Sequence, residues 1–105
     1  GAQSLREKWI RLSKSNQIWG YGAAQILPNF AYHLNSNLEF LSGIFDTNIQ
    51  KHGFYYPGLK PQIIPPKDSL EHETIIITAI NNTQLILRSL LNQKIKKTLP
   101  MHWSV

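Results

Sequence analysis

The chain has 105 residues and a hydrophobic fraction of 42%, which predicts one domain with its own core rather than a disordered chain. It contains no cysteine, which excludes disulfides, thiolate metal sites and cysteine nucleophiles. The net charge is +5, but the basic residues gather near the two ends, as expected for a solvated helix face and an end cluster. We therefore expect no nucleic-acid partner.

The sequence also carries no signal for a membrane or for secretion. No apolar run approaches the roughly 18 residues of a membrane helix, and the first residues do not resemble a secretory signal. We expect a cytoplasmic protein without a membrane partner. The first residue is Gly1 rather than Met, so we expect a fragment of a larger, multidomain protein.

Residues 4–14 predict an amphipathic helix, because apolar side chains recur along one face at Leu5, Trp9 and Leu12. A short apolar strand is expected over residues 17–20 and a second helix over residues 23–34. Pro28 interrupts the helical pattern, because proline removes a backbone donor. Either residues 23–27 form a separate first turn or the helix bends at Pro28.

Four further strands are expected, at residues 40–45, 62–64, 74–80 and 98–101. Residues 74–80 are β-branched and almost all apolar, which is typical of a central parallel strand. Asn81 and Asn82 then begin another helix, whose core face is formed by residues 86, 87, 90 and 91. This alternation predicts a small three-layer α/β domain with a mostly parallel sheet of about five strands, in the order 3-2-1-4-5.

The first strand ends in a glycine turn, Gly20-Tyr21-Gly22-Ala23, followed by the second predicted helix. A strand, a glycine turn and a helix N-terminus form the front end of a nucleotide-binding α/β unit, so the domain core over residues 17–101 is predicted to be Rossmann-like. Gln25 stands where a third glycine would complete the dinucleotide motif. The turn is either a ligand-binding loop or a purely structural connection.

Two more polar positions follow strand ends. Asp46 lies 24 residues after Gly22, close to where a dinucleotide fold binds a ribose hydroxyl with an acidic side chain. Alternatively, its side chain caps the turn formed by residues 46–48. Residues 79–82, which include Asn81 and Asn82, are expected to face the glycine turn across the point where the strand order reverses.

These motifs together resemble the C-terminal domain of SAM-dependent nucleotide-sugar C-methyltransferases. The resemblance extends from about Gln17 to the end of the chain, through motifs that occur in the same order. They are Gly20-Tyr21-Gly22-Ala23, Phe45-Asp46-Thr47-Asn48 with Lys51, Tyr56-Pro57-Gly58, Pro65-Pro66 and Asn81. Two departures are Gln25-Ile26-Leu27-Pro28, near which the family often has a lysine, and Ile80-Asn81, where it often has Trp-Asn.

The resemblance implies a domain that frames a nucleotide-sugar substrate, preceded in the same protein by a zinc-binding domain and a methyltransferase domain. S-adenosylmethionine, zinc and the catalytic base would belong to those domains, so no cofactor and no catalytic residue are expected in this chain. The resemblance and the glycine turn together point to eight substrate-binding residues. They are Gly20, Tyr21, Gly22, Ala23, Gln25, Asp46, Asn81 and Asn82.

The residues themselves offer little for catalysis by this chain alone. The four histidines have no paired spacing, which disfavours a metal site. One alternative is therefore a structural or interaction module that has lost its ligand and associates through Trp9, Trp19 or the segment Phe54-Tyr55-Tyr56. Binding of an NAD-like dinucleotide is a further alternative, which the missing third glycine disfavours.

Overall fold

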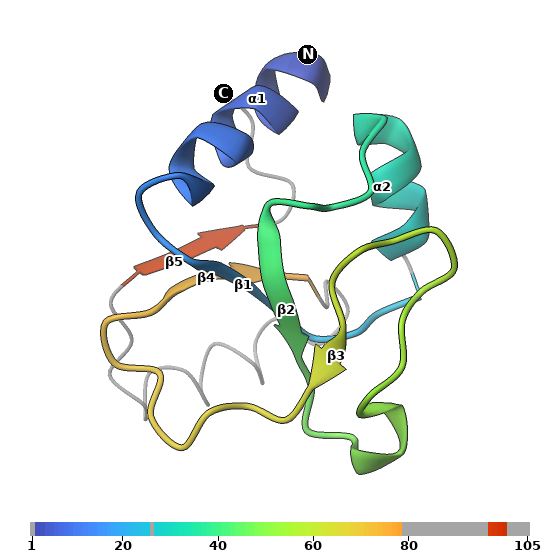
Figure 1. Ribbon diagram of the computed structural model, residues 1–105, viewed down its shortest axis with the longest axis vertical. Coiled ribbons are helices and arrows are strands. Elements are labelled where there is room, and N and C mark those ends of the chain that lie inside the picture. Colours follow the sequence, from blue (N-terminus) through green and yellow to red (C-terminus); the bar gives the residue numbers. More distant parts are fainter. Residues whose placement is uncertain (1, 26, 79–96, 101–105) are drawn as a thin grey trace.

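A computed structural model describes residues 2–25, 27–78 and 97–100 of the chain (Figure 1). It contains helices, strands and one short 3-10 helix, η1, that alternate along the sequence. In chain order these elements are α1 Ala2–Ser13, β1 Ile18–Tyr21, α2 Leu27–Leu34, β2 Leu41–Phe45, η1 Ile49–Lys51, β3 Ile63–Ile64, β4 Thr74–Ile77 and β5 Lys97–Pro100.

The strands form a parallel sheet in which β1 lies between β2 and β4, and β3 lies beyond β2. The predicted parallel sheet with the order 3-2-1-4 is confirmed. Gly20 in β1 pairs with Ile44 on one side and Ile76 on the other. β5 pairs with β4 in parallel and begins one residue before the predicted edge strand. Successive strands on both sides of β1 therefore direct their carboxyl ends to the same edge.

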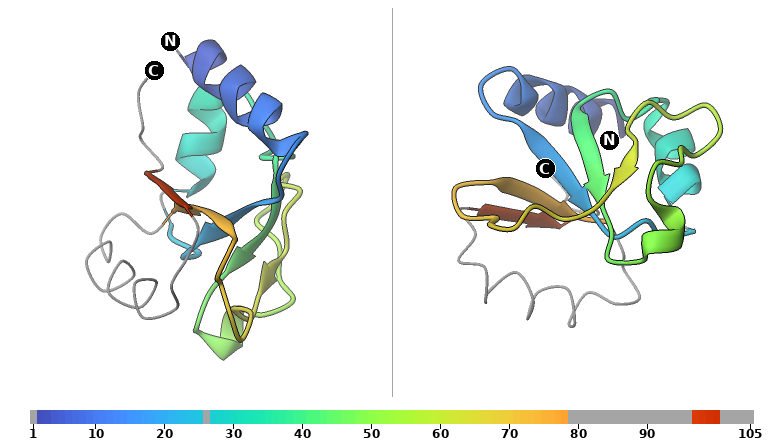
Figure 2. Two further views of the ribbon diagram at one scale, coloured as in Figure 1. Left: turned by 90° about the vertical axis from the view of Figure 1, so that its left-hand side faces the viewer. Right: turned by 60° about the horizontal axis from the view of Figure 1, so that its bottom comes forward.

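Helices α1 and α2 cover one face of this sheet (Figure 2). Trp9 of α1 is completely buried, and its ring centroid lies 5.5 Å from that of Phe30 and 5.2 Å from that of Phe40. The core cluster beneath the helices includes Ile18 and Ile44 from the two central strands. Removing a buried aromatic side chain of this size costs about 3–5 kcal/mol, so Trp9 anchors α1 to the sheet.

The opposite face carries a second apolar cluster of Trp19, Tyr21, Phe45, Leu70 and Ile75. The Trp19 and Phe45 rings are stacked at 4.8 Å. Alternating side chains of β1 thus enter different clusters, which follows from the two-residue period of a strand. The helix predicted to cover this face after Asn82 lies outside the described residues, so the third layer stays a prediction.

The predicted helix over residues 23–34 is wrong at its beginning. Helix α2 starts at Leu27, and Gly22–Gln25 form a loop. Pro28 therefore lies in the first helical turn, where a missing backbone N–H leaves no helical bond broken. Neither a separate helical turn at residues 23–27 nor a bend at Pro28 is needed. The first helix spans residues 2–13 rather than 4–14.

Candidate functional site

The loop Gly22–Gln25 leaves the carboxyl end of β1, the strand that lies between β2 and β4. Open α/β sheets bind ligands at the carboxyl ends of their strands, at the point where the strand order reverses. Gly22 has a φ of 103°, a conformation that glycine adopts without strain and other residues rarely adopt. Its N–H donates to Phe45 O at 2.7 Å, which keeps the loop against the end of β2.

Asp46 links this loop to the loop after β2. Its Oδ2 accepts from Ala23 N at 2.7 Å, and its Oδ1 accepts from Asn48 N at 2.8 Å. The second contact is the predicted side-chain cap of the turn, which is confirmed. The first was not predicted and gives the carboxylate another structural role, because it fixes the direction of one peptide in the glycine loop.

The segment between β2 and β3 supplies two more contacts to the loop. Lys51 Nζ donates to Ala23 O at 2.8 Å, and Tyr56 OH donates to Ala24 O at 2.6 Å. Burial, and secondarily the negative charge of Asp46, raise the pKa of Tyr56 from 10.0 to about 12. The hydroxyl therefore keeps its proton, and its donated hydrogen bond, throughout the neutral pH range.

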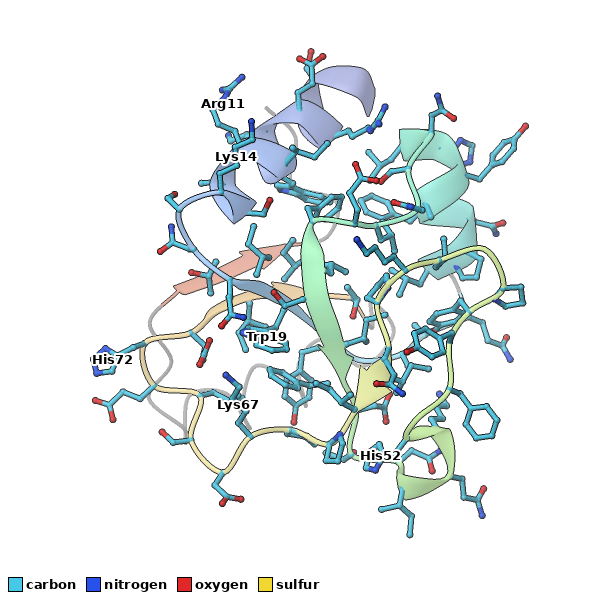
Figure 3. The ribbon with its side chains drawn as sticks, viewed as in Figure 1. Arg11, Lys14, Trp19, His52, Lys67 and His72 are labelled. Carbon is cyan, nitrogen blue, oxygen red and sulfur yellow. The ribbon has the colours of Figure 1, made fainter. Side chains whose placement is uncertain are left out.

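His52 lies beside these groups at the lower end of the molecule (Figure 3). Its Nε2 is 2.6 Å from Asp46 O, and a carbonyl oxygen can only accept, so Nε2 carries a proton and donates. This bond connects the two ends of the segment from Asp46 to His52. We call Asp46, Lys51, His52 and Tyr56 the brace, because all four tie the segment 46–56 to the glycine loop or to itself.

The residue after β4 holds the loop from the other side. Thr78 is almost completely buried, its N–H donates to Tyr21 O at 3.0 Å, and its hydroxyl donates to Gly22 O. A Cβ added to Gly20 would lie 3.2 Å from Thr78 Cγ2, so the absent side chain makes room for this contact. The chain leaving β4 and the chain leaving β1 are thus in direct contact at Thr78.

The predicted site residues other than Asp46 divide into three groups. Gly20 and Tyr21 are strand residues, so the prediction that the turn begins at Gly20 is wrong; the Tyr21 ring packs edge-on against Phe45 at 6.2 Å. Gly22, Ala23 and Gln25 do belong to the loop, where Gln25 is exposed and Ala23 is buried. Asn81 and Asn82 lie outside the described residues.

Sequence reasoning did not assign a role to Lys51, Tyr56 or Thr78. In the sequence, Lys51 and Tyr56 stand out only as parts of motifs that carry a family resemblance. Both side chains bind backbone carbonyls, and a carbonyl is present at every residue, so no spacing rule identifies the acceptor. The signal that could have found them is a polar residue in the connection between two neighbouring strands, residues 46–62, whose only helix is the short η1.

Metal-ion binding and membrane insertion each require a recognisable arrangement of residues in the described part of the chain. No group of three or more His, Asp or Glu side chains there is arranged to hold a metal ion. None of the helices in that part of the chain has the length and apolar content to span a bilayer. Arg11 and Lys14 are exposed on the outer side of α1 (Figure 3), as in the predicted solvated helix face.

Comparisons of the chain with protein-family models, with curated proteins and with solved structures found no match.

Proposed function

We propose that this chain is a Rossmann-like domain that binds a nucleotide sugar at the loop Gly22–Gln25 and frames that substrate for a SAM-dependent sugar C-methyltransferase. The observation that carries the proposal is which backbone groups of the loop already have hydrogen-bond partners. The carbonyls of Gly22, Ala23 and Ala24 all accept hydrogen bonds from side chains. The N–H groups of Ala24 and Gln25 donate to no acceptor in the described residues.

A loop with occupied carbonyls and available N–H groups suits an anion. Backbone N–H groups bind phosphate oxygens well when they precede a helix, because the helix dipole adds a partial positive charge at its N-terminus. Helix α2 begins two residues after Gln25. A diphosphate is the part of a nucleotide sugar that this loop would bind. Asn81 and Asn82 are proposed to complete the site, whereas Asp46 holds the loop in place.

The proposal assigns binding rather than chemistry to this chain. Methyl transfer to a sugar carbon needs a base that forms an enolate beside a ketone. In the part of the chain that the structure describes, the titratable groups near the loop are engaged: both Asp46 carboxylate oxygens accept backbone bonds, and Lys51 and Tyr56 donate to carbonyls. The base, S-adenosylmethionine and zinc are proposed to belong to preceding domains of the same protein.

The alternative function is an interaction module that has kept the fold without the ligand. It is favoured by the exposed apolar side chains Ile49, Phe54 and Tyr55, which are 78%, 64% and 57% exposed. Trp9 and Trp19 are buried, so their predicted role as association residues is wrong. Tyr56 is half-buried and already engaged.

Protein NMR separates the two functions. The full 105-residue chain is titrated to millimolar uridine diphosphoglucose and thymidine diphosphoglucose, with inorganic pyrophosphate as the control for non-specific anion binding. The binding proposal predicts saturable shifts of the Gly22–Gln25 amides that are larger with a nucleotide sugar than with pyrophosphate. Absence of shifts in this loop with every nucleotide sugar, together with concentration-dependent broadening around Phe54 and Tyr55, would favour the interaction module.

A further inference from the structure

We propose that Lys51 and Tyr56 are positioning residues that set the ligand affinity of the loop Gly22–Gln25 without touching the ligand. This inference rests on the proposed function. It concerns two side chains that come from the connection between β2 and β3, far from the loop in sequence: Lys51 is 28 residues from its acceptor and Tyr56 is 32 residues from its acceptor.

The first step is the geometry of the peptide group. In a planar trans peptide, the C=O of one residue and the N–H of the next point in opposite directions. Lys51 holds the carbonyl of Ala23, and this fixes the direction of the Ala24 N–H on the other side of the chain. Tyr56 holds the carbonyl of Ala24 and fixes the Gln25 N–H in the same way. The two available donors therefore point away from the brace.

The second step is the rigidity of the brace itself. The segment that carries Lys51 and Tyr56 is paired with β3 by two backbone bonds, Gly53 N to Ile63 O at 2.8 Å and Ile63 N to Phe54 O at 2.9 Å. Asn48 caps the short helix η1, its side chain accepting from Gln50 N at 3.0 Å. The brace is thus anchored to the sheet, and it transmits that rigidity to a loop that contains no regular structure.

The third step is that the loop needs such support. A flexible loop that becomes ordered only when ligand binds loses backbone entropy for each residue that is fixed. A loop that is ordered beforehand avoids that loss, and its affinity is higher for the same contacts. Ala24 O also accepts from Leu27 N at 3.2 Å, so removing the Tyr56 hydroxyl loosens the loop without leaving this carbonyl unpaired.

The test compares matched pairs of variants in the full-length chain. Tyr56→Phe removes one hydroxyl from the brace, and Tyr55→Phe removes one from the exposed neighbouring ring. Lys51→Met removes the brace ammonium, Lys60→Met removes an exposed ammonium elsewhere, and Lys51→Arg keeps a cationic donor. For each variant we would measure the dissociation constant of uridine diphosphoglucose or thymidine diphosphoglucose, whichever binds the unaltered chain, and amide hydrogen exchange in Gly22–Gln25 and in β1.

We expect Tyr56→Phe and Lys51→Met each to weaken binding about 3- to 10-fold, as for the loss of one net hydrogen bond. Exchange should accelerate in the loop while β1 keeps its protection, a pattern that general destabilisation would not produce. Lys51→Arg should recover most of the affinity, and the two control variants should bind within about twofold of the unaltered chain.

Two results would overturn the inference, and they differ from one another. If the unaltered chain binds and the brace variants bind equally well, Lys51 and Tyr56 have no positioning role although the proposed function stands. If the unaltered chain shows no saturable binding of either nucleotide sugar, the proposed function fails and the positioning role fails with it.

Discussion

The contact between Gly20 and Thr78 gives a prediction whose sign, as well as size, follows from the structure. Gly20→Ala places a Cβ 3.2 Å from Thr78 Cγ2 and 3.4 Å from Thr78 Oγ1. Overpacking of this kind costs about 1–3 kcal/mol. The less flexible unfolded chain of the alanine variant offsets about 0.4–1 kcal/mol of that cost. Thr78 is almost completely buried and both its N–H and its hydroxyl donate hydrogen bonds, so it cannot readily move away, and the variant should be less stable than the unaltered protein.

Thr78→Ser removes Cγ2 and keeps the hydroxyl that donates to Gly22 O. In the unaltered protein this deletes one methyl group from a side chain that is 1% exposed, at a cost of about 0.8 kcal/mol for the group alone. In the Gly20→Ala background the same change removes the closest contact, and the remaining ones are 3.4 Å to Thr78 Oγ1 and 3.5 Å to Ile44 Cγ1. Thr78→Ser should thus destabilise the unaltered protein and stabilise the alanine variant.

Urea unfolding of the four proteins of this double-mutant cycle, followed by circular dichroism, measures the effect. We expect a coupling free energy of about 0.5–3 kcal/mol in favour of the double variant. Gly43→Ala provides the control, because its added Cβ would contact Ile64 and Trp19 rather than Thr78. Additivity within about 0.5 kcal/mol in the Gly20 cycle would refute the packing argument.

Three further changes test the other contacts. Because the pKa of Tyr56 is raised to about 12, its contribution to the free energy of unfolding is complete below pH 10 and declines between pH 10 and 12; Tyr56→Phe should flatten this decline in urea titrations. Glu73→Gln should shift the indole N–H resonance of Trp19, because Trp19 Nε1 donates to Glu73 Oε2 at 2.8 Å. Asp46→Ala removes the acceptor of two backbone bonds and should lower the unfolding free energy by about 1.5–3 kcal/mol.

Each of these changes has a matched control within the described residues. Tyr55→Phe should leave the high-pH decline unaltered, and an equal decline in Tyr56→Phe would contradict the assignment. Glu71→Gln, two residues from Glu73, should leave the Trp19 indole resonance in place; an unmoved resonance in Glu73→Gln would remove the proposed hydrogen bond. Asp68→Ala changes an exposed carboxylate and should alter stability by less than about 0.5 kcal/mol; a similar value for Asp46→Ala would count against the brace.

The sheet was predictable from the sequence because its signal is local. Residues 74–77 are β-branched and buried from both faces as far as their side chains are described, and a run of this kind has few other stable conformations. The order of β3, β2, β1 and β4 then follows from right-handed crossovers between parallel strands. The β-branched apolar residues that identify a strand in the sequence are also the residues that pack in the core.

The beginning of α2 was not predictable from periodicity, because two conformations compete over residues 22–25. Ala23 and Ala24 have good helix propensity, but the helix would need their carbonyls for its own bonds. Lys51 binds the Ala23 carbonyl, and the Ala24 carbonyl accepts from Tyr56 and from Leu27 N, an i+3 contact rather than the i+4 bond of an α-helix. Tertiary hydrogen bonds from 28 to 32 residues away therefore override a local preference.

The polar residues between β2 and β3 therefore report on how the loop Gly22–Gln25 is held, and not directly on its ligand. Asp46, Lys51 and Tyr56 each direct a polar atom at the backbone of the glycine loop. A resemblance carried by these residues therefore describes how the loop is held. The identity of a ligand must depend instead on the opposite side of the loop, where the N–H groups of Ala24 and Gln25 point, and on the residues that face them. If the loop binds nucleotide sugars as proposed, substitutions of Lys51 and Tyr56 should lower affinity for all of them by a similar factor, whereas substitutions on the facing side should change which sugar or base is preferred.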